Sequence, residues 1–150
     1  MSRDFNKNKV AVLTGAAKKI GRSTAIKLAE QGFNILIHTG GKSIEKAKDT
    51  IKLLEKFKIK SNYVTGDLAN LETINIIKDA ALKLGTPSVL VNNAGLRIHE
   101  HFEKIDYKDW KKVMTVNVDA SFLCAQALIN YMVKQKWGRV INIGGLSAHI

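Results

Sequence analysis

Hydrophobic residues along the chain form short apolar runs that alternate with longer amphipathic stretches. Short runs with little polar interruption are typical of strands covered on both faces of a sheet. In the stretches between them, apolar residues recur every three or four positions, as on one face of an α-helix. The strands that this pattern predicts are Lys9–Leu13, Phe33–Ile37, Tyr63–Thr65, Val89–Val91 and Val140–Ile143.

The amphipathic stretches predict four helices. The first spans Ile20–Glu30, and the second begins after Ser43, an expected N-cap. The fourth begins at Asp106 or Tyr107 and continues to about Lys136. The apolar residues expected to face inward are, helix by helix, Ile20, Ala25, Leu28 and Ala29; Ile44, Ala47, Ile51 and Leu54; Ile74, Ile77, Ala81 and Leu84; and Val113, Val116, Phe122, Ala125, Leu128 and Ile129.

Five strands that alternate with four helices predict a doubly wound α/β fold of the Rossmann type. We expect a parallel sheet with right-handed crossovers and strand order 3-2-1-4-5. Ligands of such sheets bind beyond the carboxyl ends of the strands, so the candidate site is formed by the residues that follow each strand. These are residues 14–21, 38–42, 66–68, 92–95 and 144–149.

The segment Thr14–Arg22 reads Thr-Gly-Ala-Ala-Lys-Lys-Ile-Gly-Arg and lies between the first strand and the first helix. Gly15 can adopt the tight turn that other residues resist. At Gly21 a side chain would hold the helix away from a pyrophosphate or from the neighbouring strand. Backbone N–H groups and a positive helix end then face a phosphate. We therefore interpret residues 1–150 as one dinucleotide-binding domain; a turn without a ligand is the alternative.

The residues after the second strand, His38-Thr39-Gly40-Gly41-Lys42, contain no acid. Folds that prefer NAD usually place a carboxylate here, where it binds the ribose 2′-hydroxyl and would repel a 2′-phosphate. Its absence, together with Lys19 and Lys42, favours NADPH over NADH. In the alternative interpretation both lysines are simply exposed.

The net charge of +11 comes from 24 lysines and arginines against 13 acids. Attraction of an anionic cofactor, attraction of nucleic acid and plain solubility are competing explanations. The lysines are spread along the chain without a dense basic tract, and no base-reading motif is present. We therefore expect no nucleic-acid partner.

Cys124 is the only cysteine, so no intrachain disulfide can form, which fits a reducing compartment. Its apolar neighbours favour a buried, inert thiol. No apolar signal segment begins the chain, and no stretch approaches about 20 apolar residues. We expect a cytoplasmic protein with no membrane partner. The pair His99 and His101 lacks nearby ligands, so we expect no metal site.

Several motifs occur in the order and spacing of the short-chain dehydrogenase/reductase family, which the chain resembles over essentially its whole length. Within the family the chain looks like bacterial 3-oxoacyl-carrier-protein reductases, and its glycine turn and His38 are similar to those of pteridine reductases, which use NADPH. The motifs are Thr14-Gly15 through Gly21, Asp67-Leu68, Asn92-Asn93-Ala94-Gly95, Asn117, and Gly138 through Ile143.

The resemblance implies a role for each motif. Asn117 would hold a water in a proton relay. Asp67 would contact adenine; its chemistry alone fits equally a turn residue or a helix cap. The other implied contacts are Gly15, Ala16, Ala17, Lys18, Lys19, Ile20 and Gly21 with the pyrophosphate and adenosine ribose, His38, Thr39, Gly40, Gly41 and Lys42 with the 2′-phosphate, Leu68 with adenine, and Asn93, Ala94 and Gly95 with the ribose.

Three departures from the family pattern bear on catalysis. Lys19 replaces the usual middle glycine of the turn, and Gly145 falls where the catalytic serine is expected. Ser147, two residues further on, is the remaining candidate for that serine. The family's Tyr-x-x-x-Lys pair would lie beyond Ile150, together with further strands and helices. The match at 107–111 precedes Asn117, so we interpret it as chance.

The leading hypothesis is therefore the N-terminal part of an NADPH-dependent oxidoreductase that transfers hydride between the nicotinamide and a small-molecule carbonyl or alcohol. The 150 residues alone would bind the cofactor but reduce a ketone poorly, because the tyrosine that donates the proton is absent. The alternative is a non-catalytic dinucleotide-binding module or redox sensor. The family also implies a homo-oligomer, a dimer or tetramer packed through the long helix.

Overall fold

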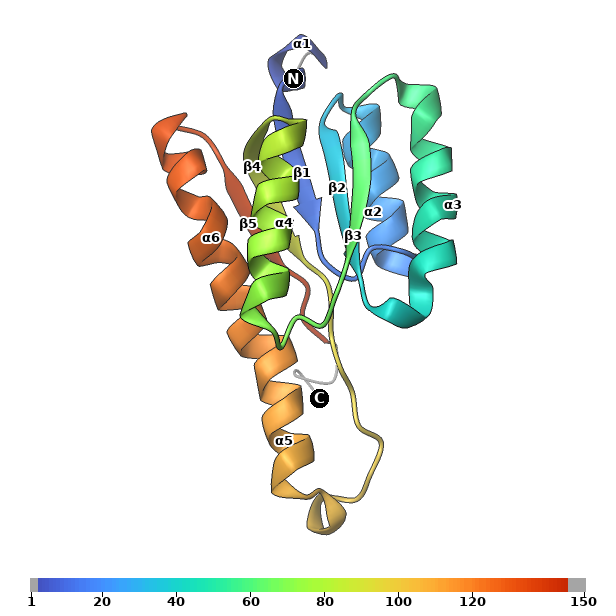
Figure 1. Ribbon diagram of the computed structural model, residues 1–150, viewed down its shortest axis with the longest axis vertical. Helices are drawn as coiled ribbons and strands as arrows, with labels where there is room; N and C mark the ends of the chain where they lie inside the picture. Colours follow the sequence, from blue (N-terminus) through green and yellow to red (C-terminus); the bar gives the residue numbers. More distant parts are fainter. Residues whose placement is uncertain (1–2, 146–150) are drawn as a thin grey trace.

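The computed structural model describes residues 3–145 as a five-stranded parallel sheet with helices on both faces (Figure 1). The strand order is β3-β2-β1-β4-β5, which confirms the predicted order 3-2-1-4-5. The strands are β1 (Lys9–Leu13), β2 (Asn34–Thr39), β3 (Ser61–Thr65), β4 (Thr86–Asn92) and β5 (Arg139–Asn142); the helices are α1 (Arg3–Asn6), α2 (Lys19–Glu30), α3 (Ile44–Leu54), α4 (Leu71–Leu84), α5 (Tyr107–Met114) and α6 (Ala120–Lys134).

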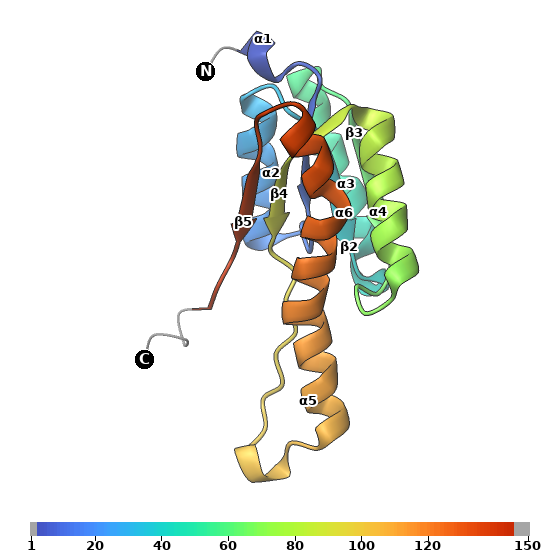
Figure 2. The ribbon, with the colours of Figure 1, turned by 90° about the vertical axis from the view of Figure 1, so that its left-hand side faces the viewer.

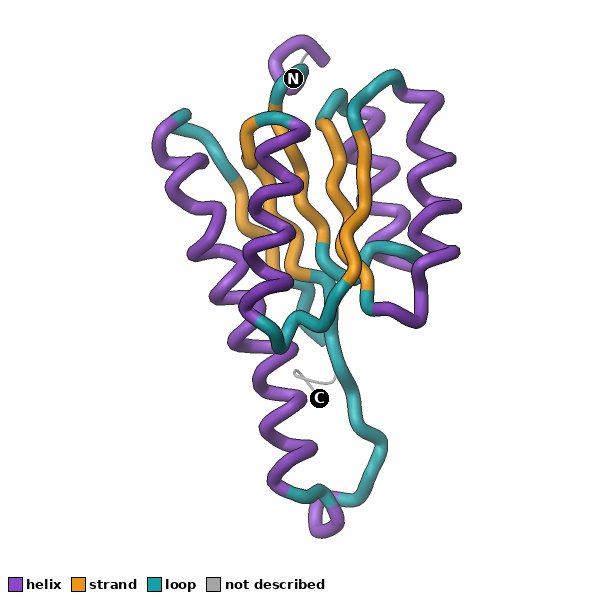
Figure 3. Tube along the Cα trace, in the orientation of Figure 1, coloured by secondary structure: helices purple, strands orange, loops and turns teal. Residues whose placement is uncertain are grey.

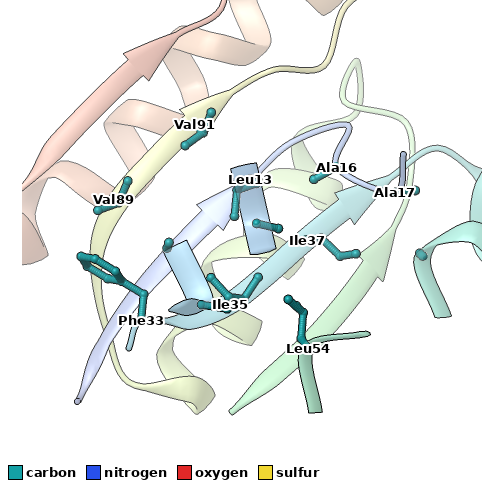
Figure 4. Packing of buried hydrophobic residues seen from close by; sticks show 13 residues of the cluster. Leu13, Ala16, Ala17, Phe33, Ile35, Ile37, Leu54, Val89 and Val91 are labelled. Carbon is teal, nitrogen blue, oxygen red and sulfur yellow. The ribbon is translucent and has the colours of Figure 1, made fainter. Parts of the chain in front are cut away.

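Two hydrophobic clusters hold these layers together. On the face covered by α2 and α3, Leu13 and Ile37 pack with Leu54 (Figure 4). On the opposite face, covered by α4 and α6, Leu36 packs in a cluster that includes Leu128. Successive residues of a strand point to opposite faces. A strand between two helical layers is therefore buried on both faces, which explains why the runs Val10–Leu13 and Ile35–Ile37 are apolar without alternation.

The long helix is continuous from α5 to α6 through a π-helical segment, Thr115–Asp119, and α5 projects beyond the carboxyl edge of the sheet (Figure 2). The buried face of α6 repeats every four residues, at positions 120, 124, 128 and 132. The prediction that Phe122 and Ile129 face inward is wrong, since they are 62% and 40% exposed. Phe122 lies two residues after Ala120, about 200° around the helix, so it lies outside the buried stripe of α6.

The long helix also bears on the membrane prediction. Among the described residues, Tyr107–Lys134 is the single helix long and apolar enough to cross a membrane, with a mean hydropathy of 1.2 over its best window. The expectation that no stretch comes near this threshold is therefore wrong. One such helix is weak evidence for a membrane, because a core helix of a soluble protein passes the same test. On this helix, Cys124 is buried as predicted, and burial raises the pKa of its thiol to about 11.

Candidate functional site

The loops that follow β1, β2, β3 and β4 meet at the carboxyl edge of the sheet (Figure 3) and enclose a cleft of about 890 Å³. This volume lies in the range of ligand-binding clefts. The predicted residues that line it are Gly15, Ala17, Lys18, Lys19, Ile20, Gly21, His38, Thr39, Gly40, Gly41, Asp67, Leu68, Asn93, Ala94 and Gly95. Gly66, within the predicted segment 66–68, lines it as well, and so do five residues that were not predicted: Ser43, Thr65, Leu96, Lys112 and Val116.

The glycine turn and the Asn-Asn-Ala-Gly loop hold each other through hydrogen bonds. The hydroxyl oxygen of Thr14 accepts bonds from the backbone N–H groups of Asn93 and Ala94, at 3.1 and 3.0 Å. In return, the Asn93 amide donates to the carbonyls of Thr14 and Gly15, each at 3.0 Å. Two motifs 78 residues apart in the sequence therefore form one rigid wall of the cleft.

Both glycines of the turn are required by close packing. Gly15 has a φ of +63°, and a Cβ atom there would lie 2.8 Å from the Cα of Ala94. A Cβ atom at Gly21 would lie 2.6 Å from the Cα of Ala16. The close neighbours of Gly21 are therefore the turn itself and Asn93, whose Nδ2 would lie 2.8 Å from the Cβ. The predicted close approach of Gly21 to a pyrophosphate stays a prediction.

The N-terminus of α2 opens into the cleft without a partner of opposite charge. Its N-cap residue, Lys18, makes no side-chain capping bond, and the first turn contains no acid. The first N–H groups of a helix have no intrahelical acceptor, and they carry the positive end of the helix dipole. Lys18 and Lys19 add two cationic side chains to the lining. This part of the cleft therefore suits an anion.

Three predicted positions differ from expectation. Ala16 is fully buried and does not line the cleft; its N–H donates to the His38 carbonyl at 3.0 Å. Lys42 is exposed outside the cleft, because the short 3₁₀ turn Gly41–Ser43 brings Ser43 to the lining instead. Ile20 is 61% exposed and faces the cleft, so the prediction that it packs inward is wrong.

The cleft wall formed by the ends of β2 and β3 carries two titratable residues. The Nε2 atom of His38 lies 3.0 Å from the carbonyl of Gly66, and desolvation lowers the pKa of this histidine despite the opposing effects of Gly66 and Asp67. One carboxylate oxygen of Asp67 accepts from the N–H of Ala69 at 3.0 Å. This bond fits the interpretation of Asp67 as a turn residue. The cap of α4 is Asn70, whose side chain accepts from Glu72. Contact of Asp67 with adenine stays a prediction.

A hydrogen-bond network behind the turn was not predicted. The hydroxyl of the fully buried Thr50, on α3, accepts from Arg22 Nε at 2.9 Å and has the carbonyls of Ala17 and Lys46 within reach, at 3.0 and 2.9 Å. Arg22 Nη2 donates to the same Ala17 carbonyl at 3.1 Å. The network ties the turn to α3. No sequence signal marks it, because Thr50 lies among the polar positions of an amphipathic helix.

A second cavity, of about 710 Å³, lies between β4, β5 and the start of α6. Asn117 lines it, and its side chain is committed to Leu96, accepting from the Leu96 N–H at 2.7 Å and donating to the Leu96 carbonyl at 2.9 Å. A role for Asn117 in proton transfer stays a prediction. Gly145 lines the same cavity, and Ser147 lies outside the described residues.

The sequence comparisons agree with this geometry. The family profile described as short chain dehydrogenase matches residues 9–150. The chain belongs to the short chain dehydrogenase family, as the resemblance implied.

The chain is also similar to individual members of this family. It is 39% identical over 142 residues to the uncharacterized oxidoreductase YohF of Escherichia coli (strain K12), covering 93% of this chain and 56% of that protein. It is 35% identical over 141 residues to the 3-oxoacyl-acyl-carrier-protein reductase FabG of Staphylococcus epidermidis, covering 91% and 56%. The structure of acetoin dehydrogenase YohF from Salmonella typhimurium superposes with a TM-score of 0.89 and 35% identity, covering 95% of this chain and 57% of that one. The chain spans about half the length of these relatives.

Proposed function

We propose that the chain is the nucleotide-binding part of an NADPH-dependent oxidoreductase that interconverts a small-molecule carbonyl and its alcohol. The observation that carries this proposal is the first cleft, where the uncapped end of α2 and two lysines meet the loops of three other strands. The relatives named as a FabG reductase and as an acetoin dehydrogenase support this reaction class. We further propose a cytoplasmic homo-oligomer.

The cleft residues fit a dinucleotide phosphate. Open space surrounds Gly40 and Gly41, where no atom lies within 4 Å of an added Cβ, so a bulky group can lie against this backbone. The cleft lining contains Asp67 as its single acid and the three lysines Lys18, Lys19 and Lys112. A 2′-phosphate would gain from this excess of positive charge.

The chain's own residues would divide the work of binding. The N–H groups at the start of α2 would hold the pyrophosphate, and Lys18 and Lys19 would compensate the charge of the 2′-phosphate. Asn93 would fix the loop that approaches the ribose. When bound, NADPH would supply the hydride for the carbonyl carbon. Proton transfer to the carbonyl oxygen would need a donor other than the described residues of this chain.

Gly145 supports a second candidate function. It stands at the position of the family's serine, in the second cavity, and a glycine has no hydroxyl to donate to a substrate. A dinucleotide-binding module without catalysis, such as a redox sensor, is the function that this residue favours.

Binding measurements on lysine variants test the nucleotide proposal. We expect the chain to bind NADPH more tightly than NADH in isothermal titration calorimetry. Lys19 has a φ of +50°, so Lys19→Gly relieves left-handed strain of about 1 kcal/mol while removing a cation. It should stabilise the chain yet weaken NADPH binding severalfold. Lys19→Ala should weaken binding without the gain in stability.

The matched control is Lys27→Ala, on the same helix. Lys27 is exposed, pairs with Glu30 and lies outside the cleft. Its replacement should leave NADPH affinity unchanged. Equal affinities of the wild-type chain for NADPH and NADH would contradict the NADPH preference, and no binding of either would contradict the proposed function itself.

A further inference from the structure

Lys112 lines the first cleft from a helix that buries none of its residues. This helix, α5, projects beyond the carboxyl edge of the sheet (Figure 2). Lys112 and Val116 both line the cleft, whereas the neighbouring Lys111 lines neither of the two cavities described above. Residues four apart lie on the same face of a helix, so this face of the long helix is turned toward the cleft.

The base of α5 is fixed relative to the cleft. The Asn117 side chain accepts from the Leu96 N–H at 2.7 Å and donates to the Leu96 carbonyl at 2.9 Å. Leu96 is itself part of the cleft lining, and Asn117 lies five residues after Lys112 on the same continuous helix. These two bonds therefore hold Lys112 beside the cleft although α5 has no buried residue.

The ammonium group of Lys112 has no anionic partner within residues 3–145. On α3, Lys48 pairs with Glu45, three residues earlier, at 2.8 Å. Asp109 stands at the same spacing before Lys112, but the two form no ion pair. Asp67, the single acid of the cleft lining, already accepts a backbone N–H. The ammonium group therefore remains free for an anionic ligand in the cleft.

We infer that Lys112 is a nucleotide-binding residue whose ammonium group contacts a phosphate of the bound nucleotide from the side of α5. The inference rests on the proposed function, because it assigns a contact to the nucleotide proposed there. Lys18 and Lys19, at the start of α2, border the cleft from the helical layer on one face of the sheet. Helix α5 continues into α6, which covers the opposite face. The nucleotide would then lie between cations from both layers, and its phosphates would gain from each.

Two neighbouring lysines give a matched pair of variants. Lys112→Ala and Lys111→Ala remove the same charge from the same exposed helix, but only Lys112 lines the cleft. In isothermal titration calorimetry, Lys112→Ala should weaken NADPH binding about threefold to fivefold, and Lys111→Ala less than about twofold. Lys112→Glu places a like charge beside the phosphate and should weaken binding about tenfold or more. Neither alanine variant should change the melting temperature of the ligand-free chain, because both side chains are exposed.

Two further comparisons identify the phosphate. If Lys112 contacts the 2′-phosphate, Lys112→Ala should weaken the binding of NADPH and leave that of NADH unchanged. If it contacts the pyrophosphate, the binding of both should weaken alike. In either case the loss should shrink as the NaCl concentration rises from about 50 mM to about 500 mM, because salt screens an exposed ion pair.

Two results would overturn the inference and leave the proposed function standing. Equal effects of Lys112→Ala and Lys111→Ala on NADPH affinity would show that the position of the charge on α5 is irrelevant. A loss in Lys112→Ala that does not depend on salt would indicate an uncharged contact, such as one with the adenine ring. If the wild-type chain binds neither NADPH nor NADH, the proposed function fails and this inference fails with it.

Discussion

An inner strand of the sheet, β2, and an edge strand, β5, differ although both contain short apolar runs. All six residues of β2 are buried between α2, α3 and α4, whereas all four residues of β5 are exposed. Ile37 has no exposed surface, and Ile141 is 43% exposed. The same apolar pattern therefore gives a core strand inside the sheet and an exposed strand at its edge. Burial depends on the neighbouring layers, which the pattern of one strand does not encode.

The two cavities differ in a similar way, in how firmly their walls are held in place. The first cleft has walls braced from behind, by Thr14 with Asn93 and by Arg22 with Thr50. The second is lined partly by apolar residues that are exposed, among them Phe122 at 62% and Ile143 at 43%. Binding is strongest where the geometry exists before the ligand arrives. Hydrogen bonds therefore fix the walls of the first cleft, the proposed nucleotide site, more firmly than those of the second cavity.

The largest expected effect is the difference in stability between substitutions in β2 and in β5. Ile37→Ala should destabilise the chain by about 3–4 kcal/mol, because it leaves a cavity in the core. Ile141→Ala should cost about 1 kcal/mol or less, because its side chain is already half in water. Urea unfolding followed by circular dichroism measures both. Similar losses would contradict the contrast between β2 and β5.

The next largest effect is the difference in stability between substitutions at two glycines of the first cleft, Gly15 and Gly40. Gly15→Ala should cost about 2–3 kcal/mol, since it combines a left-handed backbone with a clash against Ala94. Gly40→Ala is the control, because Gly40 has extended backbone and open space around it. It should change stability by less than about 0.5 kcal/mol. Equal tolerance of the two substitutions in thermal unfolding would refute the braced turn.

The bracing network predicts a smaller effect. Thr50→Val keeps the volume of the side chain but removes the acceptor for Arg22, so the chain should lose about 1–2 kcal/mol of stability. NADPH binding should weaken too, because the Ala17 carbonyl loses its anchor on α3. Thr24→Val, which removes an exposed bond to Ile20, is the control and should affect neither. A stability loss in Thr50→Val with unaltered NADPH affinity would mean that the network supports the fold and not the site.

The smallest effect is the pH dependence from His38. Burial lowers the pKa of His38 in the folded chain, whereas the unfolded chain keeps a value of about 6.5. The unfolded state then binds more protons as the pH falls below about 6.5, so the free energy of unfolding should decrease there. His38→Asn should remove this part of the slope. An unchanged slope in chemical denaturation at pH 5 to 8 would contradict the buried, neutral ring.

Most of the fold could be predicted because short apolar runs and helical stripes report burial on two faces. The strand order followed from the topology rules of parallel sheets. Predictions failed where the local backbone path at a strand or helix end, or the packing of a helix on the sheet, decides which way a side chain points. The 3₁₀ turn Gly41–Ser43 places Lys42 outside the cleft, and Ile20 faces the cleft because α2 begins there. Phe122 and Ile129 look like core residues by composition alone; which stripe of α6 meets the sheet is a matter of packing.

The position of the site could be predicted from the sequence, but the contacts between its side chains could not. Positions after each strand identified the cleft, because parallel strands end at one edge. The brace through Thr50 and the bond between His38 and Gly66 depend on atoms brought together across 28 residues. Periodicity carries no information about such contacts.

The central claim is that the cleft at the ends of β1 to β4 binds NADPH, and hydrogen exchange tests it most directly. Deuterium uptake by backbone amides is compared with and without saturating NADPH. The account predicts slower exchange in residues 14–21, 39–43, 66–68 and 93–96, and no change at the opposite edge of the sheet, in residues 31–33 and 135–138. Protection at the opposite edge, or none at the cleft, would contradict it.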